Sequence, residues 1–177
     1  MKASTSRKTK ETKIEVILET EGAGKGEIET GVEMLNVILA ALAKGASFNL
    51  AVKARGDLET GDHHTTEDVG IALGQSISEV LKTGIGSSTV PSGECLALVA
   101  VSFGEPAFRA NFDFQGRDAG GMSLENFEHF LRTLAYNGKF TLAVRADGGS
   151  DRQKIEALST ALGRALKRAA LDSRGAK

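Results

Sequence analysis

The stretch FNLAVKARGD at residues 48–57 decides the fold, because it returns as FTLAVRADGG at residues 140–149. Farther along each copy, EDVGIALGQSI at residues 67–77 lies against EALSTALGRAL at residues 156–166. Amphipathic elements resemble one another loosely, but a general likeness does not produce the same FxLAV strands and ALG segments at matching places. These paired stretches indicate an internal duplication of the chain.

The helix that precedes each FxLAV strand repeats as well. NVILAALA at residues 36–43 lies against EHFLRTLA at residues 128–135. The alignment sets these residues opposite one another: Val37 and His129, Leu42 and Leu134, Glu67 and Glu156, Leu73 and Leu162, Gly74 and Gly163.

Hydrophobic periodicity predicts the elements, since alternation is typical of strands and spacings of three and four are typical of helices. The predicted strands are residues 12–20, 26–30, 48–54, 95–103, 107–114 and 140–146. The predicted helices are residues 33–44, 66–82, 123–135 and 151–170. We expect a hairpin from the strands at 95–103 and 107–114, and a connector at the glycine- and serine-rich residues 84–93. The polar residues 172–177 are expected to be frayed.

Each half therefore contains two strands, a helix, a strand and a helix, which predicts an α+β fold with a duplicated ββαβα unit. The 177 residues, 41% of them hydrophobic, suffice for one compact domain or for two small ones that share a core. We interpret the chain as one globular domain made by duplication. Residues 1–86 form the first repeat with an N-terminal arm, and residues 87–177 form the second.

Composition argues against several kinds of partner. The 22 basic and 23 acidic residues give a net charge of -1, so neither nucleic acid nor an anionic membrane is expected. No apolar run approaches the roughly 20 residues that span a bilayer, and the polar, basic N-terminus lacks the apolar stretch of a secretory signal. Cys95 is the single cysteine, which excludes an internal disulfide and fits a cytoplasmic location.

The segment DHHTTED at residues 62–68 is the first candidate for chemistry. It stands where a loop enters a helix, and His63 and His64 precede Glu67 by four and three residues, so these side chains can converge. Neutral imidazoles and a carboxylate are ligands for a divalent cation such as zinc, manganese or iron. The alternative is a solvated helix start, with a threonine or aspartate as cap and Glu67 favoured by the helix dipole.

Motifs along most of the chain resemble those of the imidazoleglycerol-phosphate dehydratase family. GDLETGDHHTTEDVGIALGQSI at residues 56–77 resembles its first signature, D-H-H-T-x-E-D-x-x-I-A-L-G. RKTKETKIEVIL at 7–18 is similar to the opening strand, and ETGVEMLNVILAALA at 29–43 stands where the family has its first helix. EHFLRTLAYNGKFTLAVR at 128–145 resembles the E-H-F-F-R-x-x-A-x-N stretch. The chain is identified as a divergent member of this family.

The resemblance implies a fold, an assembly and a reaction. The fold is the ribosomal protein S5 domain 2-like one, with two four-stranded sheets and paired helices packed as layers. The assembly is a large symmetric homo-oligomer with active sites between subunits. The reaction removes water from a small phosphorylated imidazole, imidazole glycerol phosphate, and gives imidazole acetol phosphate in histidine biosynthesis, with manganese as cofactor.

The resemblance also implies roles for individual residues. The metal ligands would be His63, His64, Glu67, His129 and Glu156, with His129 supplied by a neighbouring subunit. The carboxylates of Glu11, Glu67 and Glu156 would handle protons beside the cation, and Glu11 would also face the substrate.

Arginines are the candidates for the substrate's phosphate, because a guanidinium binds phosphate oxygens through paired hydrogen bonds. We assign this role to Arg145, with Arg109 and Arg164 as further candidates. For each of them the alternative is an ordinary surface arginine.

Several positions depart from the family pattern. The first-helix ligand histidine is replaced by Val37, and the second signature, normally D-H-H-x-x-E, reads DRQKIE at residues 151–156. The loop G-I-x-R-F-G reads GIGSST at residues 84–89, and a lysine after the second signature is replaced by Thr160. Valine offers no lone pair and arginine stays protonated, so a single cation site is expected at most.

Two functions therefore stay open. The first is an active dehydratase with a remodelled or weakened metal site, which the retained DHHTTED segment favours. The second is a catalytically inactive paralogue that acts as a structural, regulatory or ligand-binding protein, which the loss of ligands from both repeats favours.

Overall fold

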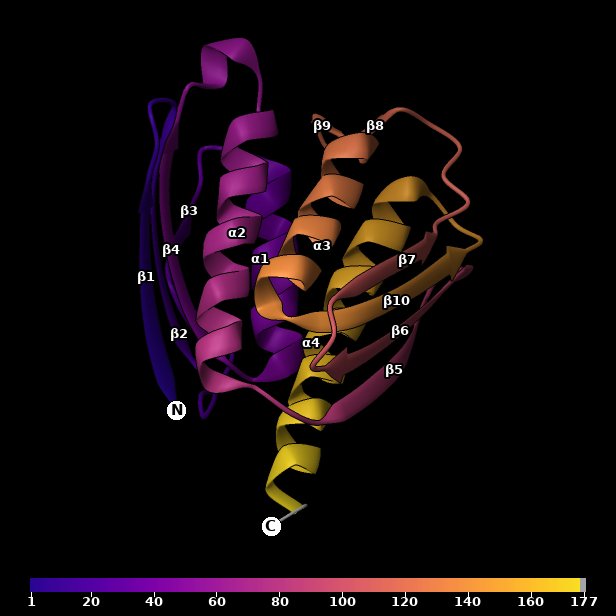
Figure 1. Cartoon of the computed structure of the whole chain (residues 1–177). Helices are drawn as coiled ribbons and strands as arrows, with labels where there is room; N and C mark the ends of the chain where they lie inside the picture. The colour runs from indigo at the N-terminus through magenta and orange to yellow at the C-terminus, as the bar shows by residue number, and fades with distance from the viewer. Residues whose placement is uncertain (176–177) are drawn as a thin grey trace.

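The helices of the protein lie between two β-sheets (Figure 1). The computed structural model describes residues 1–175. The first half contains β1 (Lys2–Lys8), β2 (Thr12–Glu19), β3 (Ile28–Glu29), α1 (Glu33–Ala46), β4 (Asn49–Gly56), the short 3-10 helix η1 (Leu58–Thr60) and α2 (His63–Val80). The second half contains β5 (Ile85–Ser92), β6 (Cys95–Phe103), β7 (Ala107–Asn111), β8 (Asp118–Ala119), β9 (Met122–Ser123), α3 (Leu124–Gly138), β10 (Phe140–Asp147) and α4 (Asp151–Gly175).

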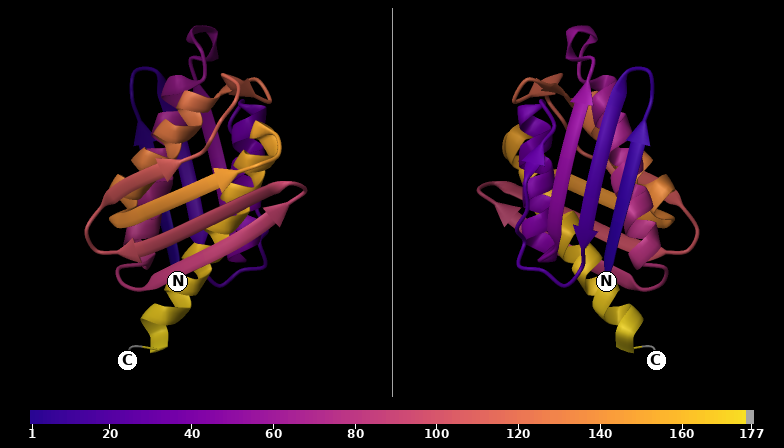
Figure 2. Two further views of the ribbon diagram at one scale, coloured as in Figure 1. Left: turned by 90° about the vertical axis from the view of Figure 1, so that its right-hand side faces the viewer. Right: turned by 90° about the vertical axis from the view of Figure 1, so that its left-hand side faces the viewer.

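Both halves build a four-stranded sheet on the same plan. The strand order is β1-β2-β4-β3 in the first sheet and β5-β6-β10-β7 in the second. In each sheet the last strand of the half is antiparallel to the second strand and parallel to the third. The strands of the two sheets cross one another on opposite sides of the helices (Figure 2). The α+β class and the two four-stranded sheets are confirmed. Each of these sheets has one strand more than the predicted ββαβα unit, and the second half adds the short two-stranded sheet β8-β9.

The two halves also agree in local backbone detail. Helix α1 is capped at its C-terminus by Ser47 and helix α3 by Lys139, with φ angles of 53° and 56°. In both cases the backbone N–H donates to two carbonyl oxygens of the last helical turn. A residue other than glycine in the left-handed region is uncommon, so its recurrence just before β4 and β10 supports a common origin of the halves.

The helices pack in two pairs, α2 with α3 and α1 with α4. Glycines allow the close approach in each pair, and two of them occupy aligned positions. A Cβ atom on Gly74 would lie 2.8 Å from the carbonyl oxygen of Leu134, and one on Gly163 would lie 2.1 Å from that of Leu42. These four positions are the ones that the repeat alignment sets opposite one another.

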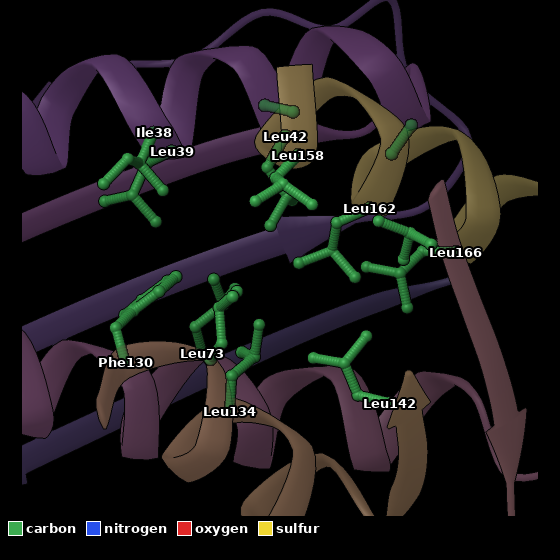
Figure 3. Close-up of a cluster of buried hydrophobic side chains, with 14 of the residues drawn as sticks. Ile38, Leu39, Leu42, Leu73, Phe130, Leu134, Leu142, Leu158, Leu162 and Leu166 are labelled. Atoms are coloured by element: carbon green, nitrogen blue, oxygen red, sulfur yellow. The ribbon is translucent and has the colours of Figure 1, made fainter. Parts of the chain in front are cut away.

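The core lies between the helix pairs and continues onto the inner faces of both sheets (Figure 3). Its leucines come from all four helices: Leu39, Leu42, Leu73, Leu134, Leu158, Leu162 and Leu166. Burying one such side chain contributes about 1.5–3 kcal/mol. The two halves therefore share one core.

The sequence pattern misses β1 and β5. In β1 only Ala3 is buried, because this is a polar edge strand that pairs with β2 alone. β5 (Ile85–Ser92) takes up most of residues 84–93, so the predicted connector is wrong. Its inward residues are small because α4 packs directly on them, and a Cβ atom on Gly86 would lie 2.0 Å from the carbonyl oxygen of Ala165. The repeat boundary predicted between residues 86 and 87 falls inside this strand.

The predicted hairpin of residues 95–103 and 107–114 is also wrong. β6 and β7 do not pair with each other, because β10 lies between them and bonds to both. Phe140, Leu142 and Val144 form the buried inner face of β10 in this central place.

The C-terminal helix is longer than predicted. α4 reaches Gly175, so residues 172–175 are helical rather than frayed, and residues 176–177 lie outside the described part. The carboxylate of Asp172 accepts the backbone N–H of Ile85 over 2.9 Å, which ties this end to β5. Among the helices of residues 1–175, none has the length and apolar character needed to cross a membrane.

Candidate functional site

Helix α2 begins within the DHHTTED segment, and the first sheet holds its start in place. The carboxylate of Asp68 accepts Arg7 Nε over 2.7 Å and also accepts the hydroxyl of Thr12. Arg7 belongs to β1 and Thr12 to β2, so this network joins the first turns of α2 to two strands. Asp68, only 8% exposed, is a structural anchor within the motif.

The histidine rings gather where α2 and α3 begin. The ring centre of His63 lies 5.8 Å from that of His64 and 5.4 Å from that of His129. Glu67 lies beside them, with Oε2 3.6 Å from His63 Nε2. The resemblance implies that His129 comes from a neighbouring subunit, but α3 packs on α2 and brings the four residues together in one chain. We call these four residues the histidine cluster.

Further polar side chains surround His63. Asn126 Oδ1 lies 3.0 Å from His63 Nδ1, and Asn126 Nδ2 donates to Asp62 Oδ1 over 2.7 Å. Within the described residues, the other oxygen of Asp62 and the hydroxyl of Thr65 are buried without a hydrogen-bond partner. Nearly all buried polar atoms in proteins have hydrogen-bond partners, so two such atoms without one are unusual. This end of α2 therefore has hydrogen-bonding capacity that the described residues do not use.

The donors of the histidine cluster suit a divalent cation in chemical type. Two imidazoles that bind one ion have ring centres roughly 5 Å apart, since the metal–nitrogen bond is about 2.1 Å. The observed separations of 5.8 and 5.4 Å are close to that value. No three His, Cys, Asp or Glu side chains of residues 1–175 already form a metal-binding group. His63 and Glu67, whose side chains are 48% and 42% exposed, would therefore have to rotate to surround an ion.

The equivalent end of the second half lies where α4 packs against α1. Glu156 is on α4, and its Oε1 accepts Arg152 Nε over 2.8 Å. Val37, on α1, packs against the apolar core. Glu156 therefore lies apart from the histidine cluster of its own chain, and its carboxylate is paired with an arginine.

The other residues at the start of α4 have structural partners. Gln153 and Ser150 form a capping box, in which the Ser150 N–H donates to Gln153 Oε1 over 2.8 Å and the Gln153 N–H donates to Ser150 Oγ over 3.2 Å. Lys154 is 1% exposed and donates to the carbonyl oxygen of Asp113 and, over 3.4 Å, to Asp151 Oδ1. The segment that carries histidines in the family signature thus stabilises a helix start here.

Asp151 joins this helix start to the loop after β7. Its carboxylate accepts the backbone N–H groups of Gln115 and Gly116 at 3.1 and 2.7 Å. Burial raises the pKa of the Asp151 carboxyl, but the two N–H groups and the Lys154 ammonium outweigh burial, and the pKa lies below its ordinary value. The charged carboxylate is therefore the stabilised form in the folded protein.

Glu11, a predicted catalytic residue, lies in the turn between β1 and β2. It is exposed, and its carbonyl oxygen accepts the N–H of Asp57 over 3.1 Å. This turn stands at the same end of the molecule as the start of α2 (Figure 1).

Arg145, the predicted phosphate ligand, lies on the outer face of the second sheet. Its Nε is 3.3 Å from Asp147 Oδ2. Arg145 and Arg109 line a shallow pocket of about 440 Å³ whose lining contains no acidic residue and no member of the histidine cluster. Arg164 is exposed on α4 and does not line this pocket.

Sequence reasoning did not identify Asn126 or Lys154. Asn126 stands three residues before His129 on α3, so the helical spacing places both on one face, and this signal was available. Lys154 stands four residues before the buried Leu158, which puts a lysine on the inward stripe of α4. A lysine in such a stripe requires a buried partner, but its identity does not follow from spacing.

Comparisons with known proteins agree with the fold and the motifs. The model of the family described as imidazoleglycerol-phosphate dehydratase matches residues 30–166. The imidazoleglycerol-phosphate dehydratase of Desulforudis audaxviator is 44% identical, over 96% of this chain and 90% of that protein. The enzyme of the same name from Acetivibrio thermocellus is also 44% identical, over 93% of this chain and 88% of that protein.

A solved structure extends the likeness to three dimensions. The crystal structure of imidazoleglycerol-phosphate dehydratase from Staphylococcus aureus matches with a TM-score of 0.84 and 29% identity, over 96% of this chain and 98% of that chain. The motifs, the fold and the near-complete coverage of both chains agree, and the chain belongs to the imidazoleglycerol-phosphate dehydratase family.

Proposed function

We propose that the chain dehydrates imidazole glycerol phosphate in histidine biosynthesis, the activity for which its relatives are named. The observation that carries this proposal is the gathering of all three histidines of the chain with Glu67 at one end of the α2–α3 pair. Drift alone would not preferentially spare the ligand residues of one end while replacing those of the other.

We further propose one manganese ion at the histidine cluster. Imidazole nitrogens with a carboxylate suit such a divalent ion, and the ring separations support a shared ligand. When bound, the cation would stabilise negative charge that develops on the imidazole ring of the substrate. The α1–α4 end offers Glu156 but no histidine, so we expect no second ion there.

The carboxylates of the chain would move the protons. Dehydration removes a hydrogen from one carbon and a hydroxyl group from its neighbour, so one group must accept a proton and another must donate one. Glu67 is half exposed beside His63, which suits it to the first role. Glu11 stands at the same end, whereas Glu156 lies on the other helix pair and would have to come from a neighbouring copy.

The position of Arg145 supports a homo-oligomer with sites between copies. Its pocket contains no member of the histidine cluster, so a phosphate held by Arg145 would belong to a substrate that reaches the cluster of another copy. We propose a large symmetric homo-oligomer of this kind, which works in the cytoplasm. Its size would be measured by light scattering with and without manganese.

The experiment is a dehydration assay with imidazole glycerol phosphate and Mn²⁺, together with the metal content of the purified protein. We expect turnover with one ion per chain, and loss of both in Glu67→Gln and His129→Gln. Glu128→Gln is the matched control, because Glu128 neighbours His129 but pairs with Arg132 on the surface of α3, over 3.0 Å. Arg145→Ala should raise KM more than it lowers kcat.

A protein that binds no Mn²⁺ and shows no turnover would contradict the proposal. That result would favour the inactive paralogue, which keeps the fold as a structural, regulatory or ligand-binding protein. The capped and ion-paired start of α4 is the observation that makes this second outcome worth testing.

A further inference from the structure

Asn126 connects helix α3 to the start of α2 through two hydrogen bonds. Its Nδ2 donates to Asp62 Oδ1 over 2.7 Å, and its Oδ1 lies 3.0 Å from His63 Nδ1. Asp62 stands directly before α2, and His63 is the first residue of that helix. The side chain of Asn126 thus bridges an acidic group and a member of the histidine cluster.

The chemistry of the three groups sets the direction of these bonds. An ionised carboxylate only accepts hydrogen bonds, so the amide must turn its NH₂ group toward Asp62. The amide oxygen then faces His63, and because this oxygen only accepts, His63 Nδ1 must carry a hydrogen. A neutral imidazole holds one hydrogen, so Nε2 keeps the lone pair. Nε2 is also the nitrogen that faces Glu67.

The bridge is not a feature of the fold itself, because the second helix pair lacks it. Asn126 precedes His129 by three residues in α3. In α1 the residue three before the aligned Val37 is Met34. Met34 is buried in the core, near Gly120. At this aligned position the amide is therefore found at the end that keeps the histidines and is replaced by Met34 at the other end.

We propose that Asn126 is a positioning residue that holds His63 in the Nδ1–H form and aims the Nε2 lone pair into the histidine cluster. The preference of His63 for one tautomer stands on the hydrogen bonds alone, and its consequence for cation binding rests on the proposed function. Groups that orient a ligand histidine in this way typically affect metal affinity by about 10–100-fold.

The first test is ¹⁵N NMR of the metal-free protein with labelled histidine, at a pH where the rings are neutral. His63 should show the Nδ1–H tautomer, and the resonances are assigned with His→Gln variants at the three positions. Asn126→Leu, similar in size but without an acceptor, should lose this preference. Met34→Leu is the matched control and should leave all three rings unchanged.

The second test is titration with Mn²⁺ alone, in which Asn126→Leu should bind about 10–100-fold more weakly than the unaltered protein. A His63 ring in the Nε2–H form, or an unchanged ring in Asn126→Leu, would overturn the proposal. Should Asn126→Leu fail to fold, Asp62→Asn serves in its place, because a neutral amide no longer dictates the orientation of Asn126 and should yield mixed tautomers. If the protein shows the Nδ1–H tautomer of His63 but no dehydratase activity, the proposed function is rejected. The positioning role of Asn126 would still hold in that case.

Discussion

Helices α2 and α4 begin with aligned residues, but the polar side chains at the two helix starts differ in how far other parts of the protein engage them. At the start of α2, His63, His64 and Glu67 are solvent-accessible. Polar atoms of the preceding residue and of the first turn have no hydrogen-bond partner within residues 1–175. At the start of α4, the equivalent residues are occupied in a capping box, an ion pair and a buried lysine network. Stability and ligand binding compete for the same polar groups, because a donor already engaged by the protein is unavailable to a ligand.

The largest expected difference between the two ends concerns one aligned position, Lys154 in α4 and Thr65 in α2. Lys154→Met should lower the free energy of unfolding by roughly 2–4 kcal/mol, since it removes the cation from a buried pair with Asp151. Thr65→Val is the matched variant and should change that energy by about 0.5 kcal/mol or less, because the Thr65 hydroxyl has no hydrogen-bond partner in the part of the chain that the structure describes. Urea denaturation at neutral pH measures both, and equal losses would show that the two ends are not energetically different.

Helix packing should give the next effect. Gly163→Ala should destabilise the protein by about 1–3 kcal/mol, because the added methyl would meet the carbonyl oxygen of Leu42 at 2.1 Å. Gly74→Ala should cost less, since its nearest atoms lie 2.8 Å away and alanine regains up to about 1 kcal/mol of helix propensity. Thermal unfolding of the two variants measures the difference, and a larger loss for Gly74→Ala would contradict the closer packing of α1 on α4.

A smaller effect is expected from the capping box. Gln153→Ala should lower the free energy of unfolding by about 1 kcal/mol, because it leaves the Ser150 N–H without its acceptor. His64→Ala at the aligned position should change stability by about 0.5 kcal/mol or less, as is usual for an exposed side chain. Denaturation of both variants checks this, and a stabilising Gln153→Ala would refute the capping role.

The smallest effect is a dependence on pH at the α4 end. The pKa of Asp151 is lowered in the folded state, so its carboxylate contributes stability above its unfolded pKa of about 3.9 and loses it as the pH falls through the folded value. The stability difference between the unaltered protein and Asp151→Asn should therefore be constant near pH 6 and should shrink toward about pH 3. A difference that grows with acidity would show that Asp151 is not held in its charged form.

The accuracy of prediction from sequence differed between parts of the fold for physical reasons. The duplication follows from the repeated segments. The helices and strands β2, β4, β6 and β10 follow from periodicity, because each buries one regular face. β5 and β1 escape that signal. β5 is made of small residues on which α4 packs, and β1 is a polar edge strand. The pairing of β7 with β10 is a long-range choice, which neighbouring residues do not encode.

For the site, the motif located His63, His64 and Glu67, since three-and-four spacing on a helix is a local property. It could not place His129 beside them in one chain, because that depends on the packing of α3 against α2. It also could not reveal that Lys154 donates to the carbonyl oxygen of Asp113, because that loop lies some forty residues away in sequence.

The sequence by itself determined the family, the repeated plan and the chemical types of side chain available at each end. Only the tertiary structure decided which of those side chains meet, which are already engaged and which remain free. The physical reason is that hydrophobic periodicity acts along the chain, whereas hydrogen bonds and ion pairs between elements depend on how the helices and loops pack in space.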